Sequence, residues 1–165
     1  MTHPVVAEAI KKAAVVWVAV AGGPAYALWC MPHEGSLYVV AGPGEQDAPD
    51  LAGATEATLT LRGDHGGRIV DCPATVRRLT PGTEEWDTVT PQLAAKRLNA
   101  SGTAESLVAR WQEAGCVVAG LTPAGGAGTT GRDLPDTAAA EPPRDTPARV
   151  PVRRPFRLHR VRRKR

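Results

Sequence analysis

Residues 15–41, VVWVAVAGGPAYALWCMPHEGSLYVVA, contain three apolar segments separated by two turn sequences. The first turn, Gly22-Gly23-Pro24, combines residues that tolerate positive φ with a proline of fixed φ, and the second ends in Gly35. We therefore expect three consecutive strands, at residues 15–21, 25–31 and 36–41. Alternation along the second strand places Trp29 on one face and Leu28 on the other.

The rest of the first 121 residues predicts three more strands and several helical segments. Strands are expected at residues 57–62, 68–79 and 116–121, the first two joined by the Gly-rich turn 63–67. We expect an amphipathic helix at residues 5–13 and a helical turn at 49–53. A further helix is expected from an N-cap at Thr90 to about Leu98, and another from Thr103 to a stop at Gly115. The pattern predicts a mainly β fold with flanking helices.

Beyond Thr122 the sequence has no periodic apolar face, so the burial of apolar side chains cannot offset the conformational entropy that folding would cost there. We expect a domain at residues 1–121, followed by a disordered Pro/Ala/Gly linker and Arg-rich tail at residues 122–165. Residues 144–165 hold nine Arg and one Lys against one Asp, a net charge of +9, which leaves −6 for residues 1–143 out of a total of +3. The sequence pI of about 9.0 therefore reflects the tail, not the domain.

Length and cysteine usage limit the class of protein. With 165 residues, of which 42% are hydrophobic, the chain fits one globular domain with an appendage. The cysteines, Cys30, Cys72 and Cys116, are odd in number and widely spaced, which gives no metal-binding pattern and indicates reduced thiols in a cytoplasmic protein. The longest apolar run, residues 13–21, is far shorter than the roughly 20 residues that a transmembrane helix needs.

No strongly diagnostic catalytic motif is present, so the catalytic residues stay unknown. The chain lacks a P-loop, a GxSxG elbow and an HExxH pair. The basic pair Lys96-Arg97 is a candidate phosphate-binding site, and its alternative role is a favourable interaction with a helix C-terminus. Trp29 is a candidate apolar wall for a planar ring, and its alternative role is a core or interface anchor.

Three segments together resemble a known family. WVAV at residues 17–20, GPAYALW at 23–29 and GSLYVV at 35–40, followed by a loop, a strand and a long hairpin, resemble the pyridoxamine 5'-phosphate oxidase-like split β-barrels over about residues 10–121. The resemblance implies a six-stranded antiparallel barrel, usually a homodimer, that binds FMN or a deazaflavin at the subunit interface. It also implies that Leu28, Trp29, Ala41 and Gly42 line the cofactor.

One segment departs from the family pattern. FMN-binding members usually place a Ser with Lys or Arg just after the third strand, whereas residues 42–47 read GPGEQD here. Glu45 and Asp47 would repel a phosphate. The backbone N–H groups of Gly42 and Gly44 are candidates for an anion nest, with Lys96 and Arg97 as the source of positive charge.

Two functions follow from these observations. The first is a flavin- or deazaflavin-binding split barrel that acts as a small oxidoreductase, in which the cofactor performs the redox step. The alternative is a cofactor-free barrel that acts as a binding module. Residues 144–165 would bind phosphates of RNA, DNA or an anionic membrane face, or the acidic barrel of their own chain, although charge runs of this kind are often solvated and without a partner.

Overall fold

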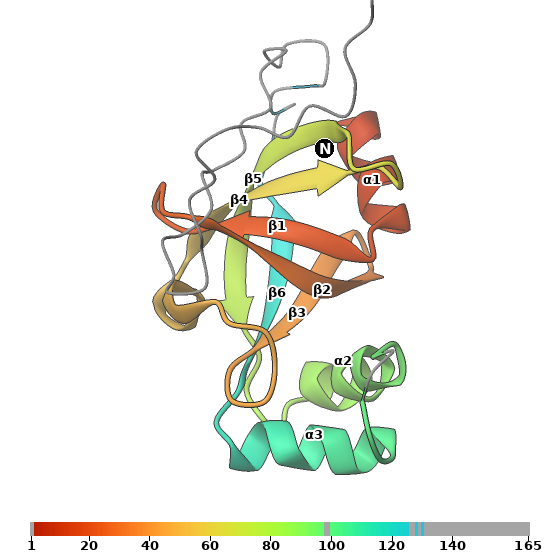
Figure 1. Ribbon diagram of the computed structural model, residues 1–165, viewed down its shortest axis with the longest axis vertical. Coiled ribbons are helices and arrows are strands. Elements are labelled where there is room, and N and C mark those ends of the chain that lie inside the picture. Colours follow the sequence, from red (N-terminus) through yellow and green to blue (C-terminus); the bar gives the residue numbers. More distant parts are fainter. Residues whose placement is uncertain (1, 98–99, 126–127, 129, 131–165) are drawn as a thin grey trace, which may run out of the picture. The chain divides into compact units, whose positions relative to one another are not determined.

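The computed structural model describes residues 2–97, 100–125, 128 and 130, all of which belong to one compact unit. Six antiparallel strands close into a barrel in the order β1-β2-β3-β6-β5-β4 (Figure 1). The strands are β1 (Val15–Ala19), β2 (Ala25–His33), β3 (Ser36–Ala41), β4 (Glu56–Arg62), β5 (Arg68–Arg78) and β6 (Val117–Pro123). The expected six-stranded antiparallel barrel is therefore confirmed.

The first three strands form where the turn sequences require. Gly22 and Gly35 adopt φ values of 72° and 78°, a region that glycine enters without steric cost. β2 pairs with β1 along residues 25–29 but with β3 only along residues 30–33. Residues 25–29 of β2 therefore have no strand partner among the described residues on the edge that faces away from β1.

Two apolar cores result from the strand alternation. The interior core contains Val16, Leu28, Leu59 and Val70, and it is closed by α1 (Pro4–Lys12), which contributes Val6, Ala9 and Ile10. The second core lies between the outer face of β2, β3 and β6 and the helices α2 (Glu84–Ala95) and α3 (Ala104–Glu113). Its members include Met31, Tyr38, Val118, Leu93 and Trp111. β3 is buried along its whole length because both cores pack against it.

The prediction that a helix begins at Thr90 and runs to about Leu98 is wrong about where the helix begins. α2 begins at Glu84, its N-cap is Thr83, and Pro91 lies inside it. Thr90 is a mid-helix residue whose hydroxyl donates to the Trp86 carbonyl at 2.8 Å. Pro91 removes one backbone hydrogen bond, but the helix tolerates this loss because Trp86, Val89 and Leu93 bury one face at helical spacing and acidic residues occupy its first turn.

Other expected helical segments occur where predicted. The 3₁₀ helix η1 spans Pro49–Gly53, and α3 is capped by Thr103, whose side chain accepts from the Ser106 N–H. Within the described residues, no helix combines the length and apolar character needed to cross a membrane. The expected disorder of residues 122–165 and the Arg-rich tail at 144–165 fall almost entirely outside the described residues.

Candidate functional site

A groove of about 430 Å³ lies between the C-terminal ends of α1 and α2. Its floor is β2, which contributes Trp29, Cys30 and Pro32. One bank is the end of α1 and the next residues, and the other is the end of α2; they contribute Lys11, Lys12, Ala13 and Ala14, and Leu93, Ala95, Lys96 and Arg97. The groove therefore combines an apolar floor with basic residues on both banks.

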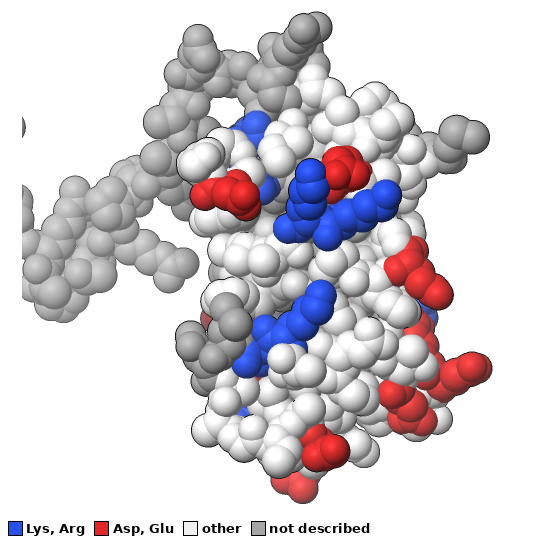
Figure 2. All heavy atoms as spheres, turned by 90° about the vertical axis from the view of Figure 1, so that its right-hand side faces the viewer, with Lys and Arg blue, Asp and Glu red and all other residues white. Residues whose placement is uncertain are grey.

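The banks carry charge that is only partly neutralised. Lys12 pairs with Glu8 at 2.9 Å, an exposed ion pair one helical turn apart. Lys11 and Lys96 are exposed, and within the described part of the chain neither has an ion pair. On the face that carries the ends of α1 and α2, Figure 2 shows two groups of Lys and Arg separated by a stretch of uncharged surface. An anion that enters the groove would thus meet cations from both sides.

Trp29 is half-buried, and a glutamine holds its backbone. The Trp29 N–H donates to Gln46 Oε1 at 2.6 Å, and Gln46 Nε2 donates to the Ala27 carbonyl at 2.9 Å. The Gln46 side chain thus satisfies the edge of β2 where β3 no longer pairs with it. This clamp fixes the strand segment that carries the aromatic floor of the groove.

Glu45, the neighbour of Gln46, is the centre of a buried polar cluster. Its side chain is 1% exposed, and its carboxylate accepts from Arg97 Nη2 at 2.5 Å, from Arg110 Nη2 at 2.5 Å and from Trp111 Nε1 at 2.8 Å. Arg97 is 15% exposed, and its Nε has no hydrogen-bond partner in the described structure. Two guanidinium groups thus surround one carboxylate, which leaves a net positive charge beside the groove.

Comparisons with known proteins were made on sequence and on structure. No family model matches the chain, and no curated protein matches its sequence. Among solved structures, HutZ, a heme storage protein from Vibrio cholerae, superposes with a TM-score of 0.54 at 14% identity over 80% of this chain and 98% of its own. An FAD-binding protein from Mesorhizobium loti gives a TM-score of 0.51 at 14% identity over 76% of this chain and 91% of its own. The chain has the pyridoxamine 5'-phosphate oxidase-like split-barrel fold.

The split barrel separates the sequence-predicted site residues into three groups, of which the third is the pair of loop glycines, Gly42 and Gly44. Trp29, Lys96 and Arg97 line the groove. Leu28 and Ala41 are 0% and 3% exposed and belong to the interior core. Alternation explains this division, because Leu28 and Trp29 are adjacent on one strand and so point to opposite faces.

The two glycines of the predicted anion nest lie in the loop after β3. The Gly42 N–H donates to the Gln46 carbonyl at 3.1 Å. Gly44 has a φ of 76° and lies near Arg110, where an added Cβ would be 4.0 Å from Nε. Glu45 does not project from this loop as the expected repulsive carboxylate, because it turns inward and is neutralised by Arg97 and Arg110.

Sequence reasoning missed Lys11 and Lys12 as groove residues and Glu45 as the partner of Arg97. The basic end of α1 was visible in the sequence, but the fold was needed to bring it beside α2. Glu45 and Arg97 are 52 residues apart, and no local pattern connects them. Nothing in the local sequence therefore identified this pair.

The Cys30 thiol beside the groove has a raised pKa. Burial raises the pKa of Cys30 to about 12, although the nearby Lys96 charge acts in the opposite direction. Burial likewise raises the pKa of Cys72 to about 11. All three cysteines are free and buried. Cys30 lines the groove but belongs to the interior core, so it contributes no thiolate to the groove.

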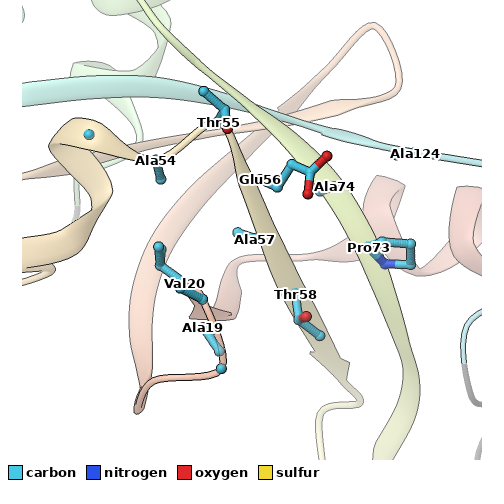
Figure 3. Close-up of a pocket in the computed structure, with 13 residues that line it drawn as sticks. Ala19, Val20, Ala54, Thr55, Glu56, Ala57, Thr58, Pro73, Ala74 and Ala124 are labelled. Carbon is cyan, nitrogen blue, oxygen red and sulfur yellow. The ribbon is translucent and has the colours of Figure 1, made fainter.

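Two other hollows of the split barrel differ from the groove in charge. A hollow of about 540 Å³ at one end of the barrel is lined mainly by short side chains of β1, β4 and β5, and its one charged lining residue is Glu56 (Figure 3). A hollow of about 520 Å³ beside the start of α2 is lined by His33, Glu34, Tyr38, Arg77, Glu84 and Glu85, among others. Carboxylates outnumber cations in both, so the groove is the best of the three for an anion.

Proposed function

We propose that this split barrel binds FMN or a phosphorylated deazaflavin in the groove between the ends of α1 and α2, and that it serves as a small oxidoreductase. The observation that carries the proposal is the presence of Trp29, Lys11 and Lys96 in one groove. Its volume of about 430 Å³ lies within the roughly 300–1,000 Å³ of small-molecule sites. An aromatic floor with basic banks matches a ligand that is planar and apolar at one end and doubly anionic at the other.

The donor set fits a flavin phosphate. Lys11, Lys96 and Arg97 would hold the phosphate, because all three line the groove and each carries positively charged N–H donors. The Trp29 indole and Leu93 would contact the ring system. A bound flavin supplies hydride or electron transfer, while these residues bind it, orient it and exclude water from one side of the ring.

The groove is less suited to heme, the group named for the structural neighbour from Vibrio cholerae. Heme iron needs an axial ligand such as His, Met, Cys thiolate or Tyr. Among the described residues that line the groove, only Cys30 is of these types, and its raised pKa of about 12 favours the protonated thiol. His33 and Tyr38 line the other hollow, beside the start of α2. These contacts favour a flavin over heme.

A titration of the full-length protein tests the proposal. We expect FMN to quench tryptophan fluorescence saturably with micromolar affinity, and the purified protein to show a flavin absorbance band if it retains the cofactor. The double variant Lys11→Gln/Lys96→Gln should weaken FMN binding, whereas Arg78→Gln, an exposed cation at the end of β5, is the matched control. Failure of FMN and of a deazaflavin to bind to the folded protein would overturn the proposal.

We also propose a homodimer in the cytoplasm. The outer face of β1 and β2 carries Val15, Trp17, Ala19, Ala25 and Ala27 beside Trp29, and none of these residues is charged. A second copy on this face would place partner residues next to the groove. Sedimentation of Ala27→Arg, compared with wild type, tests this surface, and an unchanged monomeric mass in both would contradict it.

The alternative function, a cofactor-free binding module, has one observation in its favour. Glu45 already pairs with Arg97, and Gln46 already bonds to the backbone edge of β2, so part of the hydrogen-bonding capacity that a ligand would use is taken up within the protein. In that case the Arg-rich residues 144–165 would bind nucleic acid or another anionic surface. Salt-dependent binding of a labelled RNA by the full chain, lost when the tail arginines are replaced by Gln, together with no response to FMN, would support this alternative.

A further inference from the structure

The loop after β3 sends two adjacent side chains in opposite directions. Gln46 bonds to the β2 backbone at Trp29 and Ala27. Glu45 bonds to Arg97 at the end of α2, and to Arg110 and Trp111 of α3. This pair therefore contacts two groove residues. Gln46 bonds to the backbone of Trp29, and Glu45 bonds to the guanidinium of Arg97.

The loop itself is held in one conformation. The Gly42 N–H donates to the Gln46 carbonyl at 3.1 Å, and the Glu45 N–H donates to the Gly42 carbonyl at 2.9 Å. Gly42 has a φ of 136°, and an added Cβ would lie 3.1 Å from Cys116 Cα, so only glycine fits this position. The Cys116 thiol also donates to the Pro43 carbonyl at 3.5 Å. A loop with these constraints can hold other groups in place.

We infer that Glu45 and Gln46 are positioning residues of the groove, and that Glu45 makes the site selective for phosphorylated over unphosphorylated flavins. The inference rests on the proposed function. Glu45 holds Arg97 by one terminal nitrogen, so that the remaining donors of the guanidinium are fixed in place at the groove edge. Gln46 holds the segment that carries Trp29, which contacts the ring and not the phosphate.

The geometry favours positioning over competition between Glu45 and a ligand anion. One carboxylate accepts from two arginines, so Arg97 keeps positive charge in excess of its partner. Its Nε is buried without a partner and does not bond to Glu45. An ordered arginine loses little further side-chain entropy when it binds a phosphate, whereas a freed arginine must be ordered by the ligand.

The test compares Glu45→Gln with Glu85→Gln in the full-length protein. Both carboxylates bind an arginine and an aromatic donor, but Glu85 lies outside the groove. Affinity for FMN and for riboflavin, which lacks the phosphate, is measured for each variant. We expect Glu45→Gln to weaken FMN binding by about tenfold with riboflavin unchanged, the loss of one well-placed charged hydrogen bond, and Glu85→Gln to change neither.

The direction in which Glu45→Gln changes the FMN affinity distinguishes positioning from competition. If Glu45 only competes with the phosphate, its neutralisation raises the local positive charge and FMN binds more tightly; tighter or unchanged FMN binding overturns the inference. Gln46→Ala is a second variant, expected to weaken FMN and riboflavin by the same factor because it loosens the floor. A change in their ratio there would also contradict the inference. Absence of FMN binding to the wild type overturns the proposed function together with the inference, whereas binding that Glu45→Gln leaves intact overturns the inference alone.

Discussion

The two ends of α2 carry polar clusters of similar composition and different setting. At the C-terminal end, Glu45 is 1% exposed and accepts from Arg97, Arg110 and Trp111. At the N-terminal end, Glu85 is 27% exposed, binds Arg77 by both oxygens and accepts from the Tyr38 hydroxyl at 2.8 Å. The first cluster connects a loop to two helices, and the second connects a helix to two strands.

The neighbours of each cluster distinguish a candidate site from a structural feature. Both ends of α2 carry charges that complement the helix dipole, acidic in the first turn and basic after the last, so charge alone does not indicate function. The C-terminal cluster adjoins an aromatic floor and two lysines, Lys11 and Lys96, that form no ion pair with the described residues. The N-terminal cluster faces a hollow in which Glu34 and Glu84 add negative charge. An anion is therefore expected at one end of α2 and not at the other.

The largest expected difference is in stability. Glu45→Ala leaves the largely buried Arg97 without a partner and should lower the free energy of unfolding by about 3 kcal/mol. Glu85→Ala affects the half-exposed Arg77 pair and should cost less than about 1 kcal/mol. Urea denaturation of both variants measures the difference. Equal losses would contradict the distinction between a buried and an exposed cluster.

The next effect concerns the aromatic floor. Trp29→Ala should weaken FMN binding by about 2 kcal/mol, roughly thirtyfold, because the flavin ring loses its stacking surface. Trp17→Ala is the control for a lost indole on the same face of the sheet, since Trp17 lies outside the groove, with Arg62 over its ring at 5.0 Å. Sedimentation of this variant checks that the proposed dimer is retained. Equal losses of FMN affinity in the two variants, measured by equilibrium titration, would contradict the placement of the ligand in the groove.

A smaller effect is expected from a single bank cation. Lys96→Gln should weaken FMN binding about three- to fivefold at low ionic strength, because one exposed charge contributes modestly. The difference from wild type should shrink as salt is added. Arg78→Gln, the exposed control, should leave the affinity unchanged. A salt-independent effect of Lys96→Gln would show that the lysine acts by something other than its charge.

The smallest effects appear in the pH dependence of the N-terminal cluster. Burial and the Glu85 hydrogen bond raise the pKa of Tyr38 from its usual 10.0 to about 12, so its contribution to stability is present below pH 10.0 and is lost as pH rises towards 12. The Arg77 hydrogen bond lowers the pKa of Glu85, whose contribution is present above its ordinary pKa of 4.5 and is lost as pH falls below it.

Glu85→Gln should therefore change both ends of the pH profile. It should reduce the acid loss of stability and allow Tyr38 to ionise below pH 12, a change read from phenolate absorbance in comparison with Tyr38→Phe. An unchanged Tyr38 titration in Glu85→Gln would show that burial alone sets this pKa.

The barrel was predictable from sequence because its signals are local. Turn glycines and alternating strands predicted the boundaries of β3 to the residue and those of the other strands within two residues. α2 was misplaced because Pro91 fitted a helix start, whereas the buried Trp86 and Val89 extend the helix towards its true cap at Thr83. Only some of the groove residues could be predicted from the sequence. Trp29, Lys96 and Arg97 could be named singly, but the approach of α1 and the Glu45–Arg97 pair depend on tertiary contacts between distant segments.

The location of a bound flavin tests the central claim most directly. Backbone amide and indole resonances of the full-length protein, followed during titration with FMN, would report which end of α2 the ligand contacts. We expect the largest shifts at Trp29, Lys96 and Arg97, with those of His33, Tyr38 and Glu85 unchanged. Shifts centred on the N-terminal hollow, or none at saturating FMN, would contradict the assignment of the groove as the cofactor site.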